Sequence, residues 1–183
     1  MKLEYIVKST DNGKLIKDIL SSSLKISHRL LITLKRENAL FLNGMPCYVY
    51  KEASNGDKIT VSFDYEEDNS NIISKEFPLD IIYEDECLLI INKPAGIPVH
   101  PSILHYEDSL SSGVKFYFDK IGLKKKIRPV TRIDKNTSGI VVFAKNEYIQ
   151  ECLIKQMKEN VFEKEYIAVV EGLFEENLKK RHN

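Results

Sequence analysis

Apolar residues in the first 63 positions recur with two different periods, which predicts a small unit of helices and strands. Helical spacing predicts one helix over residues 14–24 and a second helix after Ser27, whose hydroxyl is a suitable N-cap. Runs of β-branched and aromatic residues predict strands, and the pair Asn43-Gly44 predicts a hairpin between two of them. The predicted strands are residues 5–7, 39–42, 47–50 and 58–63.

A second set of elements is predicted after residue 78. The pattern indicates two apolar strands around an acidic turn, a proline-rich loop, a helix, a buried β-branched strand, a further helix and a last strand. In chain order these are residues 81–91, 92–101, 109–121, 140–143, 147–158 and 162–172. The expected fold class is α+β, with a first domain at residues 1–63, an acidic linker at 64–78 that lacks periodicity, and a second domain at 79–183 with a mixed, mainly antiparallel sheet.

Composition narrows the class of protein. The 183 residues are 43% hydrophobic and have a formal net charge of +0, so any affinity for nucleic acid must come from local patches. Three widely spaced cysteines and four histidines without ligand spacing predict neither a disulfide framework nor a metal site. No glycine-rich phosphate-binding string is present, which argues against a nucleotide-dependent enzyme. No apolar run reaches the roughly 18 residues of a membrane span, and no signal peptide is recognised, so a cytoplasmic protein is expected.

The densest positive charge in the first domain surrounds the second predicted helix, where no acid occurs between residues 19 and 36. The candidate RNA-binding residues of this basic helix are Lys25, Arg29, Lys35 and Arg36. Such a cluster binds phosphates with strong salt dependence, whereas the alternative is an ordinary solvated basic face. A second basic run, residues 124–128, precedes the motif described next and is a candidate for contacts to phosphates beside a target nucleotide.

The string Thr-Arg-Ile-Asp-Lys-Asn-Thr-Ser-Gly at residues 131–139 places a guanidinium two positions before a carboxylate and leads into the buried strand. An isolated Arg-x-Asp is most often an ion pair in a turn. The whole string, however, resembles the His-Arg-Leu-Asp-x-x-Thr-Ser-Gly signature of the RluA-type pseudouridine synthases, from which Thr131 and Ile133 depart. The resemblance implies that Asp134 is the catalytic carboxylate and that Arg132 enters the RNA stack where the target nucleotide has flipped out.

Two further strings resemble the same family. Residues 92–101 match Asn-Lys-Pro-x-Gly-x-x-Val-His-Pro, a loop near the family's active site, and residues 164–172 match Lys-x-Tyr-x-Ala-x-Val-x-Gly. The second match implies that Tyr166 packs against the uracil ring, while a half-buried strand aromatic is the ordinary alternative. In the first domain, Leu42-Asn43-Gly44 and residues 56–61 resemble the small RNA-binding domain of the ribosomal-protein S-four type, which implies that this domain anchors the protein on RNA.

These resemblances imply an RNA pseudouridine synthase that isomerises uridine to pseudouridine in structured RNA, with ribosomal RNA as the expected partner. The reaction breaks the bond between ribose and uracil nitrogen 1, turns the base and rejoins it through carbon 5. The implied enzyme therefore needs no cofactor, metal or nucleotide, and a monomer without a membrane partner is expected. The carboxylate either adds to the sugar or base or removes a ribose proton, and the sequence leaves both routes open.

The family's downstream motif, Gly-Arg-x-His-Gln-Ile-Arg, has no match after Gly172. The resemblance implies that a basic side chain of this motif pairs with the catalytic Asp. The catalytic domain is therefore expected to be incomplete at its C-terminus, with little or no synthase activity in the 183-residue chain. A non-catalytic RNA-binding protein is the alternative interpretation.

Overall fold

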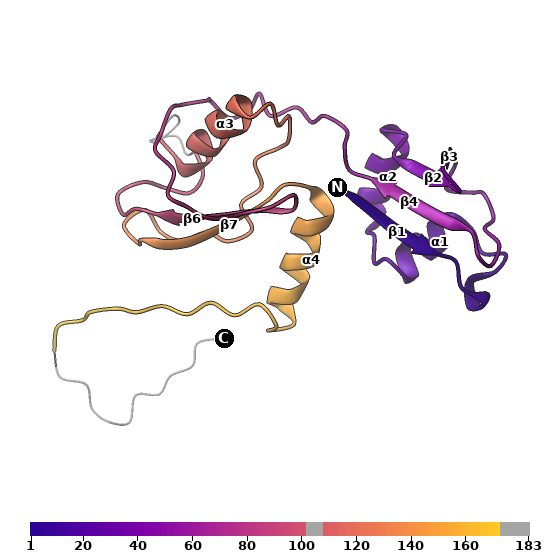
Figure 1. Ribbon diagram of the computed structural model, residues 1–183. Coiled ribbons are helices and arrows are strands. Elements are labelled where there is room, and N and C mark those ends of the chain that lie inside the picture. The colour runs from indigo at the N-terminus through magenta and orange to yellow at the C-terminus, as the bar shows by residue number, and fades with distance from the viewer. Residues whose placement is uncertain (102–107, 173–183) are drawn as a thin grey trace.

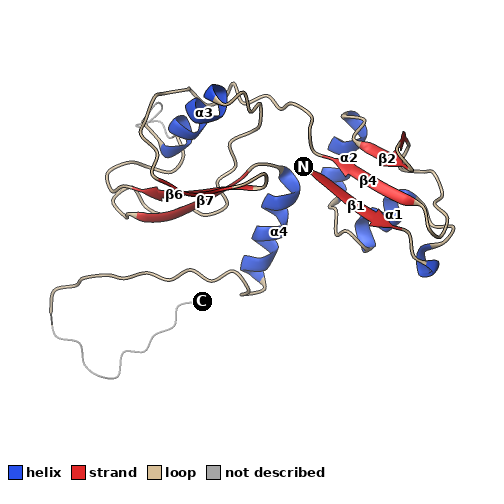
Figure 2. Ribbon diagram, viewed as in Figure 1, coloured by secondary structure: helices blue, strands red, loops and turns tan. Residues whose placement is uncertain are grey.

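The computed structural model describes residues 1–101 and 108–172, so the last part of the predicted second domain, residues 173–183, lies outside the described residues. Two antiparallel sheets, each packed against helices, make up the described chain (Figure 1; Figure 2). The α+β class is therefore confirmed. None of the helices in these residues is both long and apolar enough to cross a membrane.

The first sheet has the strand order β1-β4-β2-β3, and two helices pack against it. Its elements are β1 (Lys2–Ile6), α1 (Ile16–Ser22), α2 (His28–Arg36), β2 (Leu40–Leu42), β3 (Met45–Pro46) and β4 (Lys58–Ser62). Ile59 and Val61 of β4 share one face of the sheet, because alternate strand residues point the same way, and both are fully buried in the core that includes the helices. Ser27 accepts a hydrogen bond from Leu30 N at 3.1 Å, so the predicted N-cap of α2 is confirmed.

The predicted hairpin forms, but its returning strand differs from the prediction. Asn43-Gly44 has positive φ at both residues, 53° and 81°, as a two-residue hairpin turn requires. The returning strand β3 starts directly after this turn and ends at Pro46. The prediction of a strand at residues 47–50 is wrong. This segment turns toward α1, where the carbonyl of Val49 accepts from Lys17 N at 2.9 Å.

The second sheet has the order β5-β6-β7, and each of its strands is antiparallel to its neighbour. Its elements are β5 (Ile81–Glu84), β6 (Leu88–Lys93), α3 (Leu110–Lys120), β7 (Gly139–Ala144) and α4 (Glu147–Lys158). The two strands around an acidic turn, both helices and the buried strand are thus confirmed. Leu89 and Ile91 of β6 alternate onto the same face as Val141 and Phe143 of β7, and all four are fully buried in the core shared with α3.

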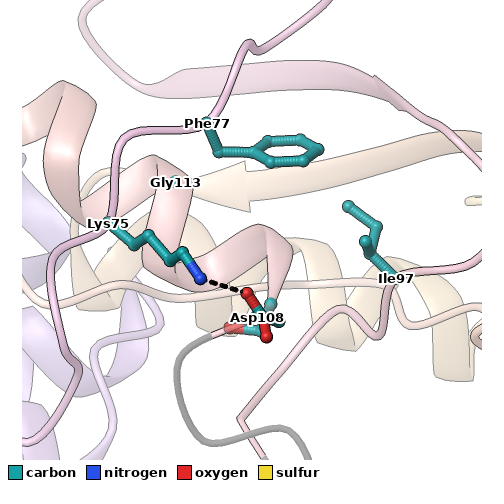
Figure 3. A pocket seen from close by; sticks show the side chains of 6 residues that line it. Lys75, Phe77, Ile97, Asp108 and Gly113 are labelled. Carbon is teal, nitrogen blue, oxygen red and sulfur yellow. Dashed lines mark hydrogen bonds and ion pairs between the residues drawn. The ribbon is translucent and has the colours of Figure 1, made fainter.

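The predicted acidic linker contains no helix or strand, and part of it packs against the second sheet. Ile72 is buried in the core of that sheet, and Phe77 lies against α3. Gly113 of α3 makes the close approach possible, because a Cβ at this position would lie 3.0 Å from the Cβ of Phe77. A hollow of about 50 Å³ lies beside this contact, with the Lys75 ammonium turned toward the Asp108 carboxylate (Figure 3).

A buried ion pair connects the predicted linker to the second sheet. Arg128 donates to both carboxylate oxygens of Glu67, and the two side chains are each only 7% exposed. The same guanidinium donates to Glu147 at 3.2 Å, at the first residue of α4. Because a buried charge is stable only with partners, this three-residue cluster ties three segments together.

The basic run at residues 124–128 is partly a structural feature. Lys125 is buried and donates to the backbone carbonyls of Phe63 and Tyr65, and burial lowers the pKa of its ammonium group. Arg128 is occupied by the ion pair described above. For these two residues the prediction of phosphate contacts is wrong, because their charges face protein groups rather than solvent.

Helix α4 lies between the two sheets (Figure 1). The Tyr148 ring stacks on Phe63 with 5.8 Å between ring centroids, and its hydroxyl donates to Leu24 O at 3.2 Å. The hydroxyl of Ser27, the N-cap of α2, donates to Glu151 at 2.7 Å. These contacts hold the basic helix against α4.

The last described segment is not a strand. Residues 162–172 form no helix or strand, and the side chains of Ile167 and Val169 are 98% and 99% exposed. A strand requires a neighbouring strand to receive its hydrogen bonds, and within residues 1–101 and 108–172 none lies beside this segment. The strand prediction for these residues is therefore wrong in the described structure.

Candidate active site

The Asp134 loop, residues 132–138, is the tip of a wide hairpin. Residues 128–131 run beside β7, with Val130 N donating to Val142 O at 2.7 Å. Thr131 is buried, and its Oγ1 accepts a hydrogen bond from Val142 N at 3.2 Å. One of the two positions that depart from the family signature therefore closes the base of the loop.

Lys93 holds the same loop from the end of β6. Its side chain is fully buried, and Nζ donates to the carbonyls of Pro94 at 2.9 Å, Ile97 at 2.8 Å and Lys135 at 3.0 Å. Gly96 N also donates to the carbonyl of Lys135, at 2.8 Å. Burial lowers the pKa of Lys93, and the three carbonyls satisfy its donors. The backbone directly after the catalytic candidate is thus fixed by the proline-rich loop.

A groove of about 610 Å³ opens between the second sheet and residues 162–167. The sheet lines it with the face opposite α3, through Ile90, Ile140 and Val142. The remaining lining comes from the last described segment, which includes Tyr166, and from the hairpin residues Thr131, Ile133, Thr137, Ser138 and Gly139. A mostly apolar groove beside a few polar groups is a suitable shape for binding a flat base.

Asp134 and Arg132 are both exposed on the loop beside this groove, although neither lines it. The carbonyl of Asp134 accepts from Thr137 N at 3.1 Å, which makes a turn at the tip. Its carboxylate forms no ion pair or side-chain hydrogen bond within the part of the chain that the structure describes. Partial burial and then the positive charge of Arg132 lower the pKa of His100 in the proline-rich loop.

The four basic residues predicted to bind RNA remain exposed and are not brought to the Asp134 loop. Arg36 Nε donates to Glu37 at 2.8 Å, so part of its charge is neutralised. Lys35 Nζ lies 5.3 Å from the ring centroid of Tyr50. Lys25 precedes α2 with a positive φ of 56°. The basic helix is therefore a surface separate from the loop that carries Asp134.

Sequence reasoning missed Lys93 as a support of the loop, although a signal was present. Leu89, Ile91 and Lys93 are alternate residues of one strand, so a lysine two positions after a buried isoleucine faces inward as well. The acceptor at Lys135 lies 42 positions away, and no local pattern identifies it.

Replacing Lys93 with methionine is expected to lower the free energy of unfolding by about 2–3 kcal/mol, because buried carbonyls lose a donor. Urea unfolding of the 183-residue chain measures this change. The matched control is Lys120→Met, an exposed lysine at the end of α3, for which a change within about 0.5 kcal/mol is expected. Equal unfolding midpoints for the two variants would contradict the structural role of Lys93.

The stretch that carries the groove and the Asp134 loop also matches a known family. Residues 87–183 match the sequence profile of the RNA pseudouridylate synthase family. The chain therefore belongs to this family, whose members are isomerases. Its resemblance to the RluA type is confirmed by relatives that are ribosomal large subunit pseudouridine synthases.

Three relatives illustrate the extent of the similarity. The chain is 33% identical over 153 residues to the uncharacterized RNA pseudouridine synthase YjbO of Bacillus subtilis, which covers 83% of this chain and 54% of that protein. It is 33% identical over 156 residues to ribosomal large subunit pseudouridine synthase D of Borreliella burgdorferi, covering 82% of this chain and 47% of the relative. It is 45% identical over 101 residues to ribosomal large subunit pseudouridine synthase C of Buchnera aphidicola, which covers 55% of this chain and 31% of that protein. The chain spans about half the length, or less, of these relatives.

Proposed function

We propose that the protein isomerises uridine to pseudouridine in structured RNA, with ribosomal RNA as the substrate and Asp134 as the catalytic carboxylate. The observation that carries this proposal is the exposed Asp134 carboxylate at the tip of a hairpin that Lys93 and Thr131 hold in place. The family membership supports the reaction, and the names of the relatives support the substrate.

The reaction requires a carboxylate and a site that holds the uracil base. Asp134 has no internal cation in the described chain, so its charge is available to a substrate or to a partner group. The apolar groove next to it suits a base that has left the RNA stack, with Tyr166 as the ring beside the uracil. Arg132, exposed on the same loop, is the cation that we propose enters the RNA stack.

Residues 1–63 are proposed as the domain of S-four type that anchors the enzyme on RNA, joined by the linker at 64–78 to the catalytic domain. The exposed basic helix supports this role. A cytoplasmic monomer that works without a cofactor is the form in which we propose that the protein acts.

The proposal is tested by mapping pseudouridine in ribosomal RNA from cells with and without the gene, by a chemical method that marks the modified base. The expected result is the loss of at least one site in the deletion strain and its return when the gene is restored. Identical maps would reject the enzyme and leave an RNA-binding protein without catalysis.

Replacing Lys25, Arg29, Lys35 and Arg36 together with alanine is expected to flatten the dependence of log affinity on log salt by about two to three units, because each phosphate contact releases counterions. Four full contacts would give slightly more, but Glu37 already neutralises part of the charge of Arg36. Affinity is measured by fluorescence anisotropy with a structured RNA at several salt concentrations. The control variant replaces four exposed lysines outside both basic clusters with alanine: Lys8, Lys120, Lys155 and Lys158. A slope that is equal in both variants would make the basic helix an ordinary solvated face.

A further inference from the structure

Two tyrosines in the segment after β3 are unusually open to solvent. Tyr48 is 85% exposed and Tyr50 is 63% exposed, and they flank Val49, which is buried. Both tyrosines line a hollow of about 250 Å³, which is also lined by Leu34 and Lys35 of α2 and by Asn38 just after that helix. Two exposed tyrosines beside one hollow offer an apolar ring face and a polar hydroxyl, a combination that is enriched at binding interfaces.

The backbone that carries these tyrosines is firmly held. Cys47 N donates to Leu40 O at 3.0 Å, which ties the segment to β2. At its other end the carbonyl of Val49 accepts from Lys17 N, and that of Lys51 accepts from Ile16 N, both at 2.9 Å. The rings therefore project from a fixed surface, which lowers the entropy cost of binding to them.

The two rings differ in what touches them. Lys17 Nζ lies 5.1 Å and Lys35 Nζ 5.3 Å from the centroid of the Tyr50 ring, so this ring makes cation–π contacts with two ammonium groups. The Tyr48 ring has no aromatic or cationic contact within the described residues. One ring is thus surrounded by positive charge, and the ring beside it is uncovered.

The surrounding chain has the charge that an anionic partner requires. Residues 14–52 contain seven lysines and arginines against three acids, Asp18, Glu37 and Glu52. Asn38, at the end of α2, adds an exposed side-chain amide to the hollow, which can pair with the edge of a base. An uncovered ring, two gathered ammonium groups and an amide match the parts of one unpaired nucleotide: the base face, its phosphates and the base edge.

We infer that Tyr48 is a stacking site for one unpaired base of RNA, with Lys17 and Lys35 on the flanking phosphates. The inference rests on the proposed function, because it assumes that RNA is the substrate, and it adds a second contact to the uridine at the Asp134 loop. The hairpin β2–β3, which leads into this segment, lies at the far end of the molecule from β7, so the two sites contact different parts of the RNA (Figure 1).

The first test uses the absence of tryptophan from the chain. Tyr48→Trp introduces a single indole at the stacking position, and Tyr83→Trp introduces one at an exposed tyrosine of β5. A single-stranded RNA of about ten nucleotides is expected to quench the indole at position 48 and to leave the one at position 83 unchanged. Equal quenching at the two positions, or none at position 48, would overturn the inference.

The second test separates stacking from charge. Tyr48→Ala is expected to weaken binding of the same RNA about tenfold, and Tyr48→Phe is expected to bind like the native chain, since stacking needs the ring and not the hydroxyl. An abasic oligomer of equal length and charge should bind both variants equally. An equal loss with the abasic oligomer would assign Tyr48 a structural role and overturn the inference. The pseudouridine map is independent of these results, so failure here leaves the proposed function standing.

Discussion

Asp134→Asn is expected to abolish pseudouridine formation while the protein still folds and binds RNA. The substitution keeps the shape of the side chain and removes the charge that the reaction uses. The exposed carboxylate forms no ion pair in the described residues, so little stability is lost with it. We expect the rate of pseudouridine formation to fall by roughly 10³-fold or more, which is the scale for loss of an acid–base or nucleophilic group, so that the modified site is lost in cells.

The assay is complementation: each variant gene is expressed in cells that lack the native gene, and pseudouridine in their RNA is then mapped. The matched control is Asp119→Asn, which removes an exposed carboxylate of α3 that pairs with Lys115. This control is expected to restore every modified site. Appreciable pseudouridine from the Asp134→Asn protein would show that another group carries the reaction.

Arg128→Met is expected to destabilise the chain by about 3–5 kcal/mol. The substitution removes the cation from a cluster in which Glu67 is only 7% and Glu147 only 21% exposed, and it leaves buried carboxylates without a partner. Arg128 also lies at the base of the hairpin that ends in the Asp134 loop, where its carbonyl accepts a hydrogen bond from Ala144 N at 2.9 Å. Urea unfolding measures the loss.

A neighbouring ion pair provides the control. Lys124→Met breaks a pair with Glu66 in which both side chains are about two-thirds exposed, at 67% and 70%, and we expect a loss below about 1 kcal/mol. The double variant Arg128→Met with Glu67→Gln should be less unstable than the sum of its two single variants, because it removes the unpaired charge. Additive losses would mean that the pair does not act as a unit.

The helices and turns of this protein could be predicted from its sequence, because each depends on residues that are close to it in the chain. Ser27 begins α2 as predicted, since an N-cap needs only the amides of the next turn. Residues 147–158 form a helix with the predicted bounds, and Asn146 caps it through Ile149 N. The string around Asp134 identified the family for the same reason, because the signature is a continuous stretch.

Only the tertiary structure decided which charges are surface and which are structural. Lys125 and Arg128 read as a basic run, yet their partners Phe63, Tyr65 and Glu67 lie about 60 positions earlier. A partner at that distance is selected by the packing of whole sheets, so no local pattern reports it.

Long-range contacts also explain why no strand forms at residues 47–50 or at residues 162–172, where the sequence predicts one. The sequence determined the turn at Asn43-Gly44. The strand after it ends at Pro46, and the backbone of Val49 hydrogen-bonds to Lys17 of α1 instead. Residues 162–172 carry the composition of a strand, but a strand exists only beside another strand, and the described chain provides none there. The sequence by itself therefore determined the helices, the turns and the motif that carries Asp134. The tertiary structure decided how Lys93 and the hairpin hold that motif, because hydrogen bonds between distant segments form only once the sheets have assembled.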